Sequence, residues 1–188
     1  MFTIAIPKGR LEKDAIMFLQ KRGIPVPDDW ERSLVQEVGE FRFILAKPSD
    51  AATMVMEGVA QAGIVGTDTL EELRPQVLRL GGLGFGLCKM VTAGPSGFLP
   101  RPWTVATRYP NIARRFTRPG ERVIVLKGSV ELAPRLGLSH VIVDLVETGK
   151  TLKANGLEVI DVLMECQAEL IANPACFGFW RNTYDKLA

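Results

Sequence analysis

One short stretch of the chain, residues 140–152, gathers side chains that could bind a sugar. Its sequence is HVIVDLVETGKTL, and the apolar, β-branched run at 140–143 predicts a buried strand. Two carboxylates, Asp144 and Glu147, follow at the carboxyl end of that strand. Carboxylate oxygens accept hydrogen bonds from hydroxyl groups, and the neighbouring hydroxyls of a ribose are suitable donors. The two acids therefore indicate a sugar diol.

The turn that follows these acids could hold a phosphate. Thr148 has the side chain of a helix N-cap, and Gly149 lets the backbone turn without a Cβ. A helix that begins near Lys150 would have unpaired backbone N–H groups in its first residues, up to Thr151, and these groups would point back at the turn. Those donors and the positive end of the helix dipole attract phosphate. Together, the acids and the turn predict a site for a phosphorylated ribose.

Two other interpretations of the stretch are possible. The tripeptide Gly149-Lys150-Thr151 matches the end of a nucleotide-binding P-loop. That motif needs a glycine five residues before Gly149, where the chain has Asp144, so the P-loop is excluded. A plain strand–turn–helix connection with solvated charges explains the same residues. Local chemistry does not decide between this connection and a phosphosugar site.

The composition of the chain excludes several classes of function. The 188 residues are 47% apolar and 23% charged, which is ordinary for a soluble protein of one domain or two small ones. A net charge of +2, without a basic run, gives no reason to expect nucleic acid as a partner. The sequence shows neither a leader peptide nor an apolar run long enough to span a bilayer. We therefore expect a cytoplasmic protein without a membrane partner.

Histidine and cysteine chemistry is also restricted. His140 is the only histidine, so a Ser-His-Asp triad, a Cys-His pair or a histidine-based zinc site would depend on it. It begins a predicted strand, where a structural role is favoured. Cys88, Cys166 and Cys176 are widely spaced and odd in number, so they form neither a metal-binding pattern nor a disulfide framework.

Strands and helices alternate along the whole chain, which predicts α/β layers with mostly parallel sheets. The Gly- and Pro-rich residues 94–102 interrupt the chain and predict a domain boundary. Strands are predicted at residues 2–6, 34–38, 41–46, 62–66, 85–93, 104–107, 123–126, 140–143, 157–164 and 168–172. Helices are predicted at residues 11–21, 51–60, 67–73 and 111–117, from residues 130 and 150, and in part of 177–186.

Polar turns follow five of the predicted strands. In open α/β sheets, ligands bind at the carboxyl ends of the strands, so the five turns form a constellation of candidate binding residues. Plainer interpretations exist for some of them: Asp68 is favoured as a helix cap, and Ser129 as the N-cap of a short helix. The turns are Lys8-Gly9-Arg10, residues 47–50, residues 66–68, Gly128-Ser129 and residues 144–151.

A longer signature extends through the second half of the chain, and shorter blocks precede it. The positions of the signature are Glu131, Gly137, Ser139, Ile142, Asp144, Leu145, Thr148, Gly149, Thr151 and Leu152. The other blocks are residues 5–11 (AIPKGRL), 48–50 (PSD), Gly66 with Asp68, and 105–110 (VATRYP). With these residues, the chain resembles the ATP phosphoribosyltransferase family, in the short form of its catalytic subunit. The similarity covers residues 4–174.

The resemblance implies a fold and a reaction. The fold would be two α/β lobes of the type II periplasmic-binding-protein kind, with the active site in the cleft between them. Lobe I would comprise residues 1–90 and 165–188, and the inserted lobe II residues 91–164, with the phosphoribosyl-binding loop. Members of this family are glycosyltransferases of histidine biosynthesis. They join N1 of ATP to C1 of phosphoribosyl pyrophosphate in the presence of Mg²⁺.

The resemblance also implies roles for the polar turns. Lys8, Arg10 and Lys47 would be catalytic, because they would neutralise the charge of the leaving pyrophosphate. Lys47 stands where the family usually has arginine. Lysine keeps the positive charge but lacks the guanidinium group, which can donate two parallel hydrogen bonds to one ligand. The substrate phosphates would carry Mg²⁺, without metal ligands from the chain. The substrate-binding residues would be Gly9, Ser49, Asp50, Asp68, Gly128, Ser129, Asp144, Glu147, Thr148, Gly149, Lys150 and Thr151.

A partner is implied as well. The sequence ends at Ala188, without the C-terminal regulatory domain of the family's long form. The short form works with a histidyl-tRNA-synthetase-like regulatory subunit in a hetero-octamer, so we expect feedback by histidine to act through such a partner. Two rival classes share the expected fold. They are a solute-binding protein, which would need an export leader, and a phosphosugar or nucleotide sensor that has lost catalysis.

Overall fold

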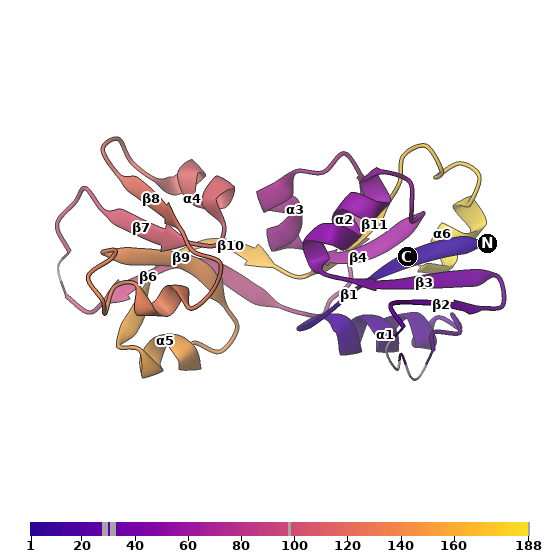
Figure 1. The fold of residues 1–188 in the computed structure, drawn as a ribbon, viewed down its shortest axis with the longest axis horizontal. Coiled ribbons are helices and arrows are strands. Elements are labelled where there is room, and N and C mark those ends of the chain that lie inside the picture. The colour runs from indigo at the N-terminus through magenta and orange to yellow at the C-terminus, as the bar shows by residue number, and fades with distance from the viewer. Residues whose placement is uncertain (28–29, 31–32, 98, 188) are drawn as a thin grey trace. The chain divides into compact units, whose positions relative to one another are not determined.

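The computed structural model describes residues 1–27, 30, 33–97 and 99–187. The chain divides into two compact units: unit 1 is Met1–Gly86 with Gln167–Ala188, and unit 2 is Leu87–Cys166 (Figure 1). Unit 2 is thus inserted into the chain of unit 1. Both units combine helices with a sheet, so the predicted α/β class is confirmed.

Unit 1 contains a six-stranded sheet in the order β2-β3-β1-β4-β11-β5. The middle strands β3, β1 and β4 are parallel, whereas β2, β11 and β5 each run antiparallel to their neighbours. The elements are β1 (Phe2–Pro7), α1 (Glu12–Lys21), β2 (Val35–Val38), β3 (Phe41–Ala46), α2 (Pro48–Met56), β4 (Ala62–Gly66), α3 (Thr67–Leu73), β5 (Leu78–Gly82), β11 (Ala168–Ala172) and α6 (Arg181–Leu187).

Helices cover both faces of this sheet (Figure 1). On one face, Phe18 and Leu19 of α1 share a core cluster with Ile4 of β1. On the other face, Val55 of α2 packs in a second cluster with Ala5. Neighbouring residues of β1 enter different clusters because successive side chains of a strand point to opposite faces. All of β1 is buried, as expected of a central strand covered on both sides.

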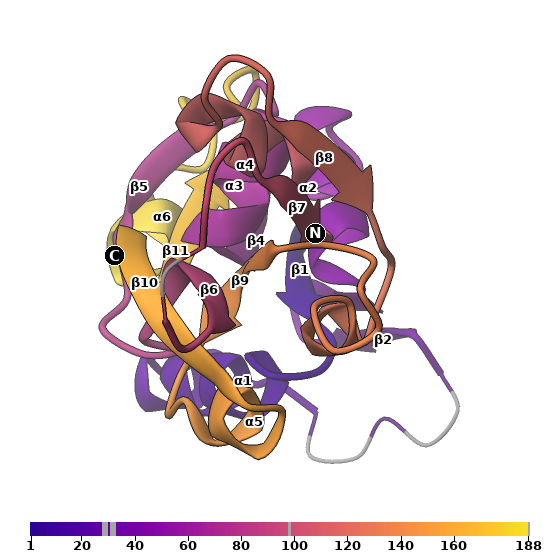
Figure 2. The same ribbon diagram turned by 90° about the vertical axis from the view of Figure 1, so that its left-hand side faces the viewer.

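Unit 2 contains a five-stranded sheet in the order β10-β6-β9-β7-β8. Strands β9, β7 and β8 are parallel, and β6 and β10 add an antiparallel pair beside them (Figure 2). Ile112 of α4 packs on one face, and Leu152 of α5 packs on the other. The elements are β6 (Cys88–Pro95), β7 (Thr104–Thr107), α4 (Pro110–Phe116), β8 (Arg122–Val125), the 3₁₀ helix η1 (Val130–Leu132), β9 (Val141–Val146), α5 (Lys150–Ala154) and β10 (Leu157–Cys166).

Several predictions about these elements are wrong. The sheets are mixed rather than mostly parallel, because antiparallel strands flank each parallel block. Strand β5 was not predicted, and the strand predicted at 85–93 begins only at Cys88. Strand β6 continues through Gly94 and Pro95 inside unit 2, so the boundary predicted at 94–102 is wrong. None of the helices in the described ranges is long and apolar enough to cross a membrane.

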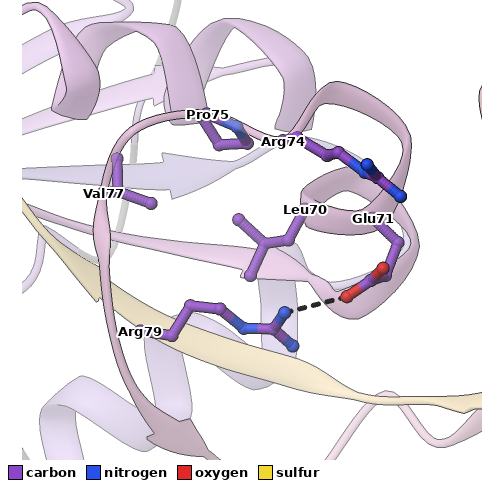
Figure 3. Close-up of a pocket in the computed structure, with 6 residues that line it drawn as sticks. All are labelled: Leu70, Glu71, Arg74, Pro75, Val77 and Arg79. Carbon is purple, nitrogen blue, oxygen red and sulfur yellow. Dashed lines mark hydrogen bonds and ion pairs between the residues drawn. The ribbon is translucent and has the colours of Figure 1, made fainter.

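Helix α3 and strand β5 border a pocket of about 260 Å³ in unit 1 (Figure 3). Its charged lining is already paired in part, because Arg79 donates to the Glu71 carboxylate at 2.9 Å. None of the residues predicted to bind substrate lines this pocket. The lining residues are Leu70, Glu71, Arg74, Pro75, Val77 and Arg79.

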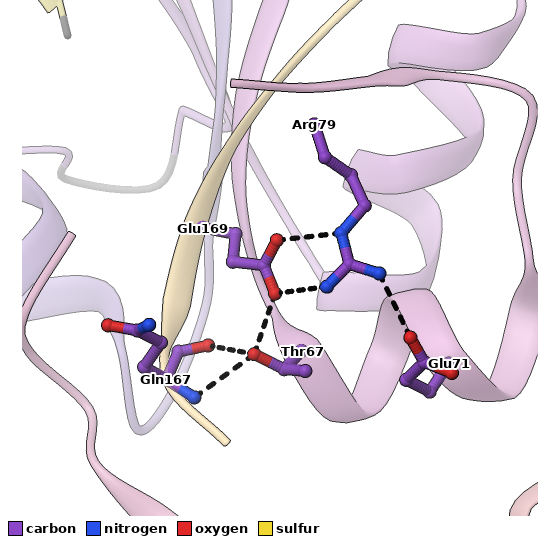
Figure 4. A network of polar contacts seen from close by, with 5 residues as sticks. All are labelled: Thr67, Glu71, Arg79, Gln167 and Glu169. Carbon is purple, nitrogen blue, oxygen red and sulfur yellow. Dashed lines mark hydrogen bonds and ion pairs between the residues drawn. The ribbon is translucent and has the colours of Figure 1, made fainter. Parts of the chain in front are cut away.

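A polar network beside the pocket connects α3, β5 and β11 (Figure 4). The buried carboxylate of Glu169 accepts from Arg79 Nε at 2.8 Å and from Arg79 Nη2 at 2.6 Å. The Thr67 hydroxyl donates to the same carboxylate at 2.7 Å and accepts from the Gln167 N–H at 3.1 Å. The bidentate pair and the hydroxyl together supply the donors that a buried carboxylate needs. This network holds the first residue of α3 against the end of the sheet.

We expect the two halves of this ion pair to differ in their effect on stability. Arg79→Met would leave a buried carboxylate without its cation and lower the free energy of unfolding by about 2 kcal/mol, less than for a fully buried pair because solvent reaches the guanidinium. Glu169→Gln would cost about 1 kcal/mol, since a neutral amide needs no counter-ion. Urea unfolding measures the free energy of unfolding of both variants.

The matched control is Arg42→Met, which breaks a surface pair with Glu37 in which both side chains are about half exposed. We expect a loss below about 0.5 kcal/mol there. Equal losses for Arg42→Met and Arg79→Met would contradict the structural role given to the buried pair.

Candidate active site

Three of the five predicted turns lie together in unit 1. Because β3, β1 and β4 are parallel neighbours, their carboxyl ends meet at one edge of the sheet. The first turn is also bonded to the end of β3, directly before the second turn, since the backbone N–H of Lys8 donates to the carbonyl of Ala46 at 2.7 Å. Residues 8–10, 47–50 and 66–68 therefore form one set of strand-end residues, as predicted.

The turn after β1 is held by its own side chains. Gly9 N–H donates to the Glu12 carboxylate at 3.0 Å, so one amide of this turn is already occupied. Arg10 Nη1 donates to the carbonyl of Gly86 at 3.0 Å, at the point where the chain leaves unit 1. Lys8 is exposed. The turn thus presents two cations on a backbone that internal hydrogen bonds keep in place.

The turn after β3 becomes a helix within one residue. Lys47 is the N-cap of α2, and Pro48 occupies the first helical position, where its missing N–H costs nothing. The helix therefore begins three residues earlier than predicted. Ser49 donates its hydroxyl proton to the Asp50 carboxylate at 3.1 Å, and both residues are exposed in the first turn. Lys47 and Ser49 are accessible to a ligand at the amino end of α2.

The turn after β4 places a buried acid at the sheet edge. The N-cap of α3 is Gly66, so the interpretation of Asp68 as the cap is wrong. Asp68 is only 8% exposed, and its carboxylate folds back over Gly66. A Cβ at Gly66 would come within 2.2 Å of Asp68 Oδ1, so glycine at this position leaves room for the carboxylate. Asp68 is therefore a positioned acid next to the network of Thr67.

The other two turns lie together in unit 2. Strands β9, β7 and β8 are parallel neighbours, so the ends of these strands also share one edge of their sheet. The N–H of Leu126 donates to the carbonyl of Thr107 at 2.9 Å and joins the ends of β8 and β7. Residues 128–129 and 144–151 therefore form a second set, as predicted.

The carboxylate of Asp144 is buried and ion-paired. Its Oδ1 accepts from Arg108 Nε at 3.1 Å and from the Leu145 N–H at 2.8 Å, and its Oδ2 accepts from Arg108 Nη2 at 3.2 Å. Asp144 is 7% exposed, whereas the Arg108 side chain is 47% exposed. Burial lowers the pKa of Arg108, but the hydrogen bonds and the charge of Asp144 outweigh it, and the pKa is raised overall.

Two details of this region differ from the prediction. Asp144 lies within β9 rather than after it, because the strand continues to Val146 in register with β6. Arg108 was not predicted as a site residue. The rule that selected Lys8 and Lys47, a cation directly after a predicted strand, selects Arg108 as well, since the strand at 104–107 ends beside it.

The loop after β9 exposes backbone donors. The N-cap of α5 is Gly149 in the left-handed conformation at φ 73°, so the prediction of Thr148 as the cap is wrong. Glu147, Thr148, Lys150 and Thr151 are exposed. Within the described parts of the chain, the amides of residues 148–151 donate to no protein acceptor. These amides can bind an anion.

Ser129 is the N-cap residue of η1, as predicted. Its backbone is left-handed at φ 48°, and its side chain makes no capping hydrogen bond. The next residue, Val130, is fully buried and anchors the turn to the core. Gly128 and Ser129 are both exposed at the end of β8.

His140 is exposed rather than buried, and it connects two strands. The Nδ1 atom of its ring accepts from the backbone N–H of Thr104 at 2.8 Å. The backbone N–H of His140 donates to the Thr104 carbonyl at 2.8 Å. This pairing supports the structural role expected for the histidine. No group of three side chains that could ligate a metal occurs among the residues that the structure describes.

Comparison with known proteins gives strong similarities. The family model described as HisG: ATP phosphoribosyltransferase matches residues 47–188. ATP phosphoribosyltransferase of Caldanaerobacter subterraneus is 45% identical, over 92% of this chain and 87% of the relative. ATP phosphoribosyltransferase of a Geobacillus species is 43% identical, over 100% of this chain and 95% of the relative.

Solved structures with a similar fold include close and distant proteins. The ATP phosphoribosyl transferase (HisG:HisZ) complex from Thermotoga maritima contains a chain with a TM-score of 0.87 and 36% identity, covering 100% of this chain and 96% of that one. A histidine kinase sensor domain described as similar to periplasmic binding proteins gives a TM-score of 0.59 at 9% identity, over 100% and 88% of the two chains. The predicted periplasmic-binding-protein-like fold is confirmed.

The left-handed backbone at Gly149 gives a test of the loop. Gly149→Ala has room for its Cβ, because the nearest atom is 3.9 Å away, but the conformation at φ 73° disfavours any Cβ. We expect the free energy of unfolding to fall by about 1 kcal/mol. Urea unfolding measures this change. Gly128→Ala is the control, because Gly128 has open space and no left-handed backbone, and equal losses for the two variants would disprove the argument.

Proposed function

The chain belongs to the ATP phosphoribosyltransferase family, and we propose that its strand-end turns carry the roles that this reaction requires. The enzyme is a glycosyltransferase that joins N1 of ATP to C1 of phosphoribosyl pyrophosphate and releases pyrophosphate. This is the first step of L-histidine biosynthesis. One observation carries the assignment of the site, and it concerns residues 144–151. In this segment the buried acid Asp144 and the exposed acid Glu147 come directly before the unpaired backbone amides of residues 148–151.

Residues 144–151 are proposed to bind the phosphoribosyl group. Asp144 and Glu147 would accept hydrogen bonds from the ribose hydroxyls. The amides of residues 148–151 would donate to the 5′-phosphate, and the exposed ammonium of Lys150 would add a positive charge. Gly128 and Ser129, at the neighbouring strand end, are proposed as further contacts of the substrates. Each group of the ligand thus meets a protein group of matching chemistry.

The turns of unit 1 are proposed to stabilise the leaving pyrophosphate. Lys8, Arg10 and Lys47 stand at one sheet edge, and three cations would neutralise charge that develops as the bond to C1 breaks. Lys47 acts as a point charge, because an ammonium lacks the planar fork of arginine. Gly9, Ser49, Asp50 and Asp68, in the same turns, are proposed as substrate contacts.

The reaction needs little acid–base catalysis. N1 of adenine already has a lone pair, so the nucleophile requires no general base, and the single exposed histidine is no obstacle. The barrier lies in separating pyrophosphate from a ribose that becomes oxocarbenium-like. Positioning the two substrates in line and compensating the leaving charge would therefore supply most of the rate enhancement.

Mg²⁺ is proposed to enter with the substrate. Among the described residues, no three ligating side chains come together, so the chain offers no cage of its own. Mg²⁺ is commonly held by substrate phosphates with one or two carboxylates, and the scattered acids of the strand ends fit that arrangement. When bound, the ion would neutralise part of the charge on the pyrophosphate.

A regulatory partner is proposed from the Thermotoga maritima relative, whose structure is a HisG:HisZ complex. We propose that this chain binds a histidyl-tRNA-synthetase-like subunit, that the two form a hetero-octamer, and that histidine acts through that subunit. The enzyme would work in the cytoplasm, where both of its substrates are made. Neither nucleic acid nor a membrane is expected as a partner.

Removal of the Asp144 carboxylate tests the site. Asp144→Ala would remove an acceptor for a ribose hydroxyl, and loss of a charge-assisted hydrogen bond of this kind costs about 1.5–3 kcal/mol. We expect KM for phosphoribosyl pyrophosphate to rise about 10- to 100-fold. Initial rates of phosphoribosyl-ATP formation, with ATP saturating and Mg²⁺ present, measure it.

Asp161→Ala is the matched control, because Asp161 is exposed on β10 in the same unit and carries no proposed role. Its kinetics should equal those of the wild type. An unchanged KM in Asp144→Ala would remove Asp144 from the site. Absence of product from the wild type, with the regulatory subunit added, would refute the enzymatic assignment.

Regulation gives a separate test. The purified chain alone should show low activity that L-histidine does not inhibit, because the proposed histidine site belongs to the partner. Addition of the regulatory subunit should raise the activity and make it sensitive to histidine. Steady-state rates with and without the subunit, over a titration of L-histidine, measure both effects. Strong inhibition of the isolated chain would contradict the proposal.

A further inference from the structure

A buried acid beside a phosphate-binding loop raises an electrostatic problem. The carboxylate of Asp144 would repel the phosphate that the amides of residues 148–151 are proposed to bind, because like charges in a partly desolvated site are costly. The structure contains a compensating charge, since the guanidinium of Arg108 bonds to both carboxylate oxygens. The pair of Arg108 and Asp144 is neutral as a unit.

We propose that Arg108 is a positioning residue for phosphoribosyl pyrophosphate, which fixes the Asp144 carboxylate for a ribose hydroxyl and cancels its charge beside the phosphate loop. The inference rests on the proposed role of Asp144. It adds a residue that was not among the predicted site residues, and it gives a reason for the chemistry of that residue. Arg108 acts through Asp144 rather than on the substrate.

The hydrogen bonds of the carboxylate define what it can still accept. A carboxylate has about four acceptor directions, two on each oxygen. Oδ1 already accepts from Arg108 Nε and from the Leu145 N–H, whereas Oδ2 accepts only from Arg108 Nη2. One direction on Oδ2 remains. With the ion pair intact, Asp144 therefore receives a single ribose hydroxyl, and Glu147, which is exposed, is left to receive the other.

The backbone around Arg108 is held in place independently of the ion pair. The fully buried hydroxyl of Thr107 donates to the carbonyl of Val143 at 2.6 Å and accepts from the Tyr109 N–H at 2.9 Å. The first bond joins Thr107 to the strand that carries Asp144, and the second joins Tyr109 to Thr107. The guanidinium also lies 5.7 Å from the centre of the Tyr109 ring. Arg108 thus approaches Asp144 from a rigid strand end.

The geometry requires arginine rather than any cation. The planar fork of a guanidinium places two N–H groups on two carboxylate oxygens, which a lysine ammonium does not do. Arg108→Lys would keep the positive charge and lose the fixed orientation. Arg108→Met would keep a similar length and lose both. The two variants therefore separate charge compensation from orientation.

The test is a double-mutant cycle on the full chain, assayed with its regulatory subunit. Arg108→Met, Asp144→Asn and the double variant are compared with the wild type by KM for each substrate, by kcat, and by calorimetric binding of phosphoribosyl pyrophosphate. We expect Arg108→Met to raise KM for phosphoribosyl pyrophosphate at least 10-fold and to change KM for ATP less than twofold. Arg108→Lys should lie between Arg108→Met and the wild type.

The cycle decides whether Arg108 acts through Asp144. In the Asp144→Asn background, Arg108→Met should change binding of phosphoribosyl pyrophosphate less than twofold, because there is no carboxylate left to orient or to neutralise. The same loss in both backgrounds would overturn the inference, since Arg108 would then contact the substrate directly. If Arg108→Met bound phosphoribosyl pyrophosphate as tightly as the wild type, the inference would be overturned as well. The pair of Arg108 and Asp144 would then be a structural ion pair only.

Two controls separate this inference from the proposed function. Arg118→Met removes another exposed arginine of unit 2 without a proposed role, and it should bind phosphoribosyl pyrophosphate as the wild type does. A wild type that binds phosphoribosyl pyrophosphate but forms no product refutes the enzymatic assignment, while the binding cycle still tests Arg108. A wild type that forms product, with unaltered Arg108 variants, refutes the inference alone.

Discussion

Each unit depends on a block of three parallel strands, β3-β1-β4 in unit 1 and β9-β7-β8 in unit 2. Parallel pairing aligns strand ends that are far apart in the sequence, so every turn after these strands emerges at one edge of its sheet. Backbone hydrogen bonds at the ends secure this alignment, as between Lys8 and Ala46 or between Leu126 and Thr107. All of the residues proposed for catalysis and binding follow from this pairing.

The antiparallel strands complete the sheets and let the chain pass between the units. Strand β6 follows the exit of the chain from unit 1, and β10, which pairs with β6, precedes the return. The returning strand β11 then inserts between β4 and β5 and brings Glu169 beside Arg79. A side-chain contact between residues 90 positions apart thus joins β11 to β5, and Glu169 also accepts from Thr67 at the start of α3, near Asp68.

Local rules predicted most of the strands and placed the five polar segments near strand ends, because hydrophobic runs and turn residues are visible in the sequence. They failed where a distant neighbour decides the structure. Strand β5 is mostly exposed and contains two glycines, so only its pairing with β11 defines it. Asp144 belongs to β9 because β6 extends the pairing beyond it. Thr148 matches the cap preference, but the left-handed turn needs glycine at the next position. The pairing of Arg108 with Asp144 joins residues 36 positions apart and leaves no local pattern.

Two of the buried acids that the structure describes, Glu169 and Asp144, have similar hydrogen-bond geometry in surroundings of different charge. Glu169 and Asp144 each accept a bidentate arginine and one further hydrogen bond. Around Glu169 the further donor is Thr67 of another element, and Arg79 also pairs with Glu71, so two carboxylates share one guanidinium and a negative charge remains. Around Asp144 the further donor is its own neighbour, and one arginine balances one carboxylate. A neutral pair beside unpaired amides suits an anionic ligand, whereas the negative network of Glu169 does not. The balance of charge, rather than burial or the number of hydrogen bonds, therefore distinguishes the carboxylate proposed to bind substrate from the structural one.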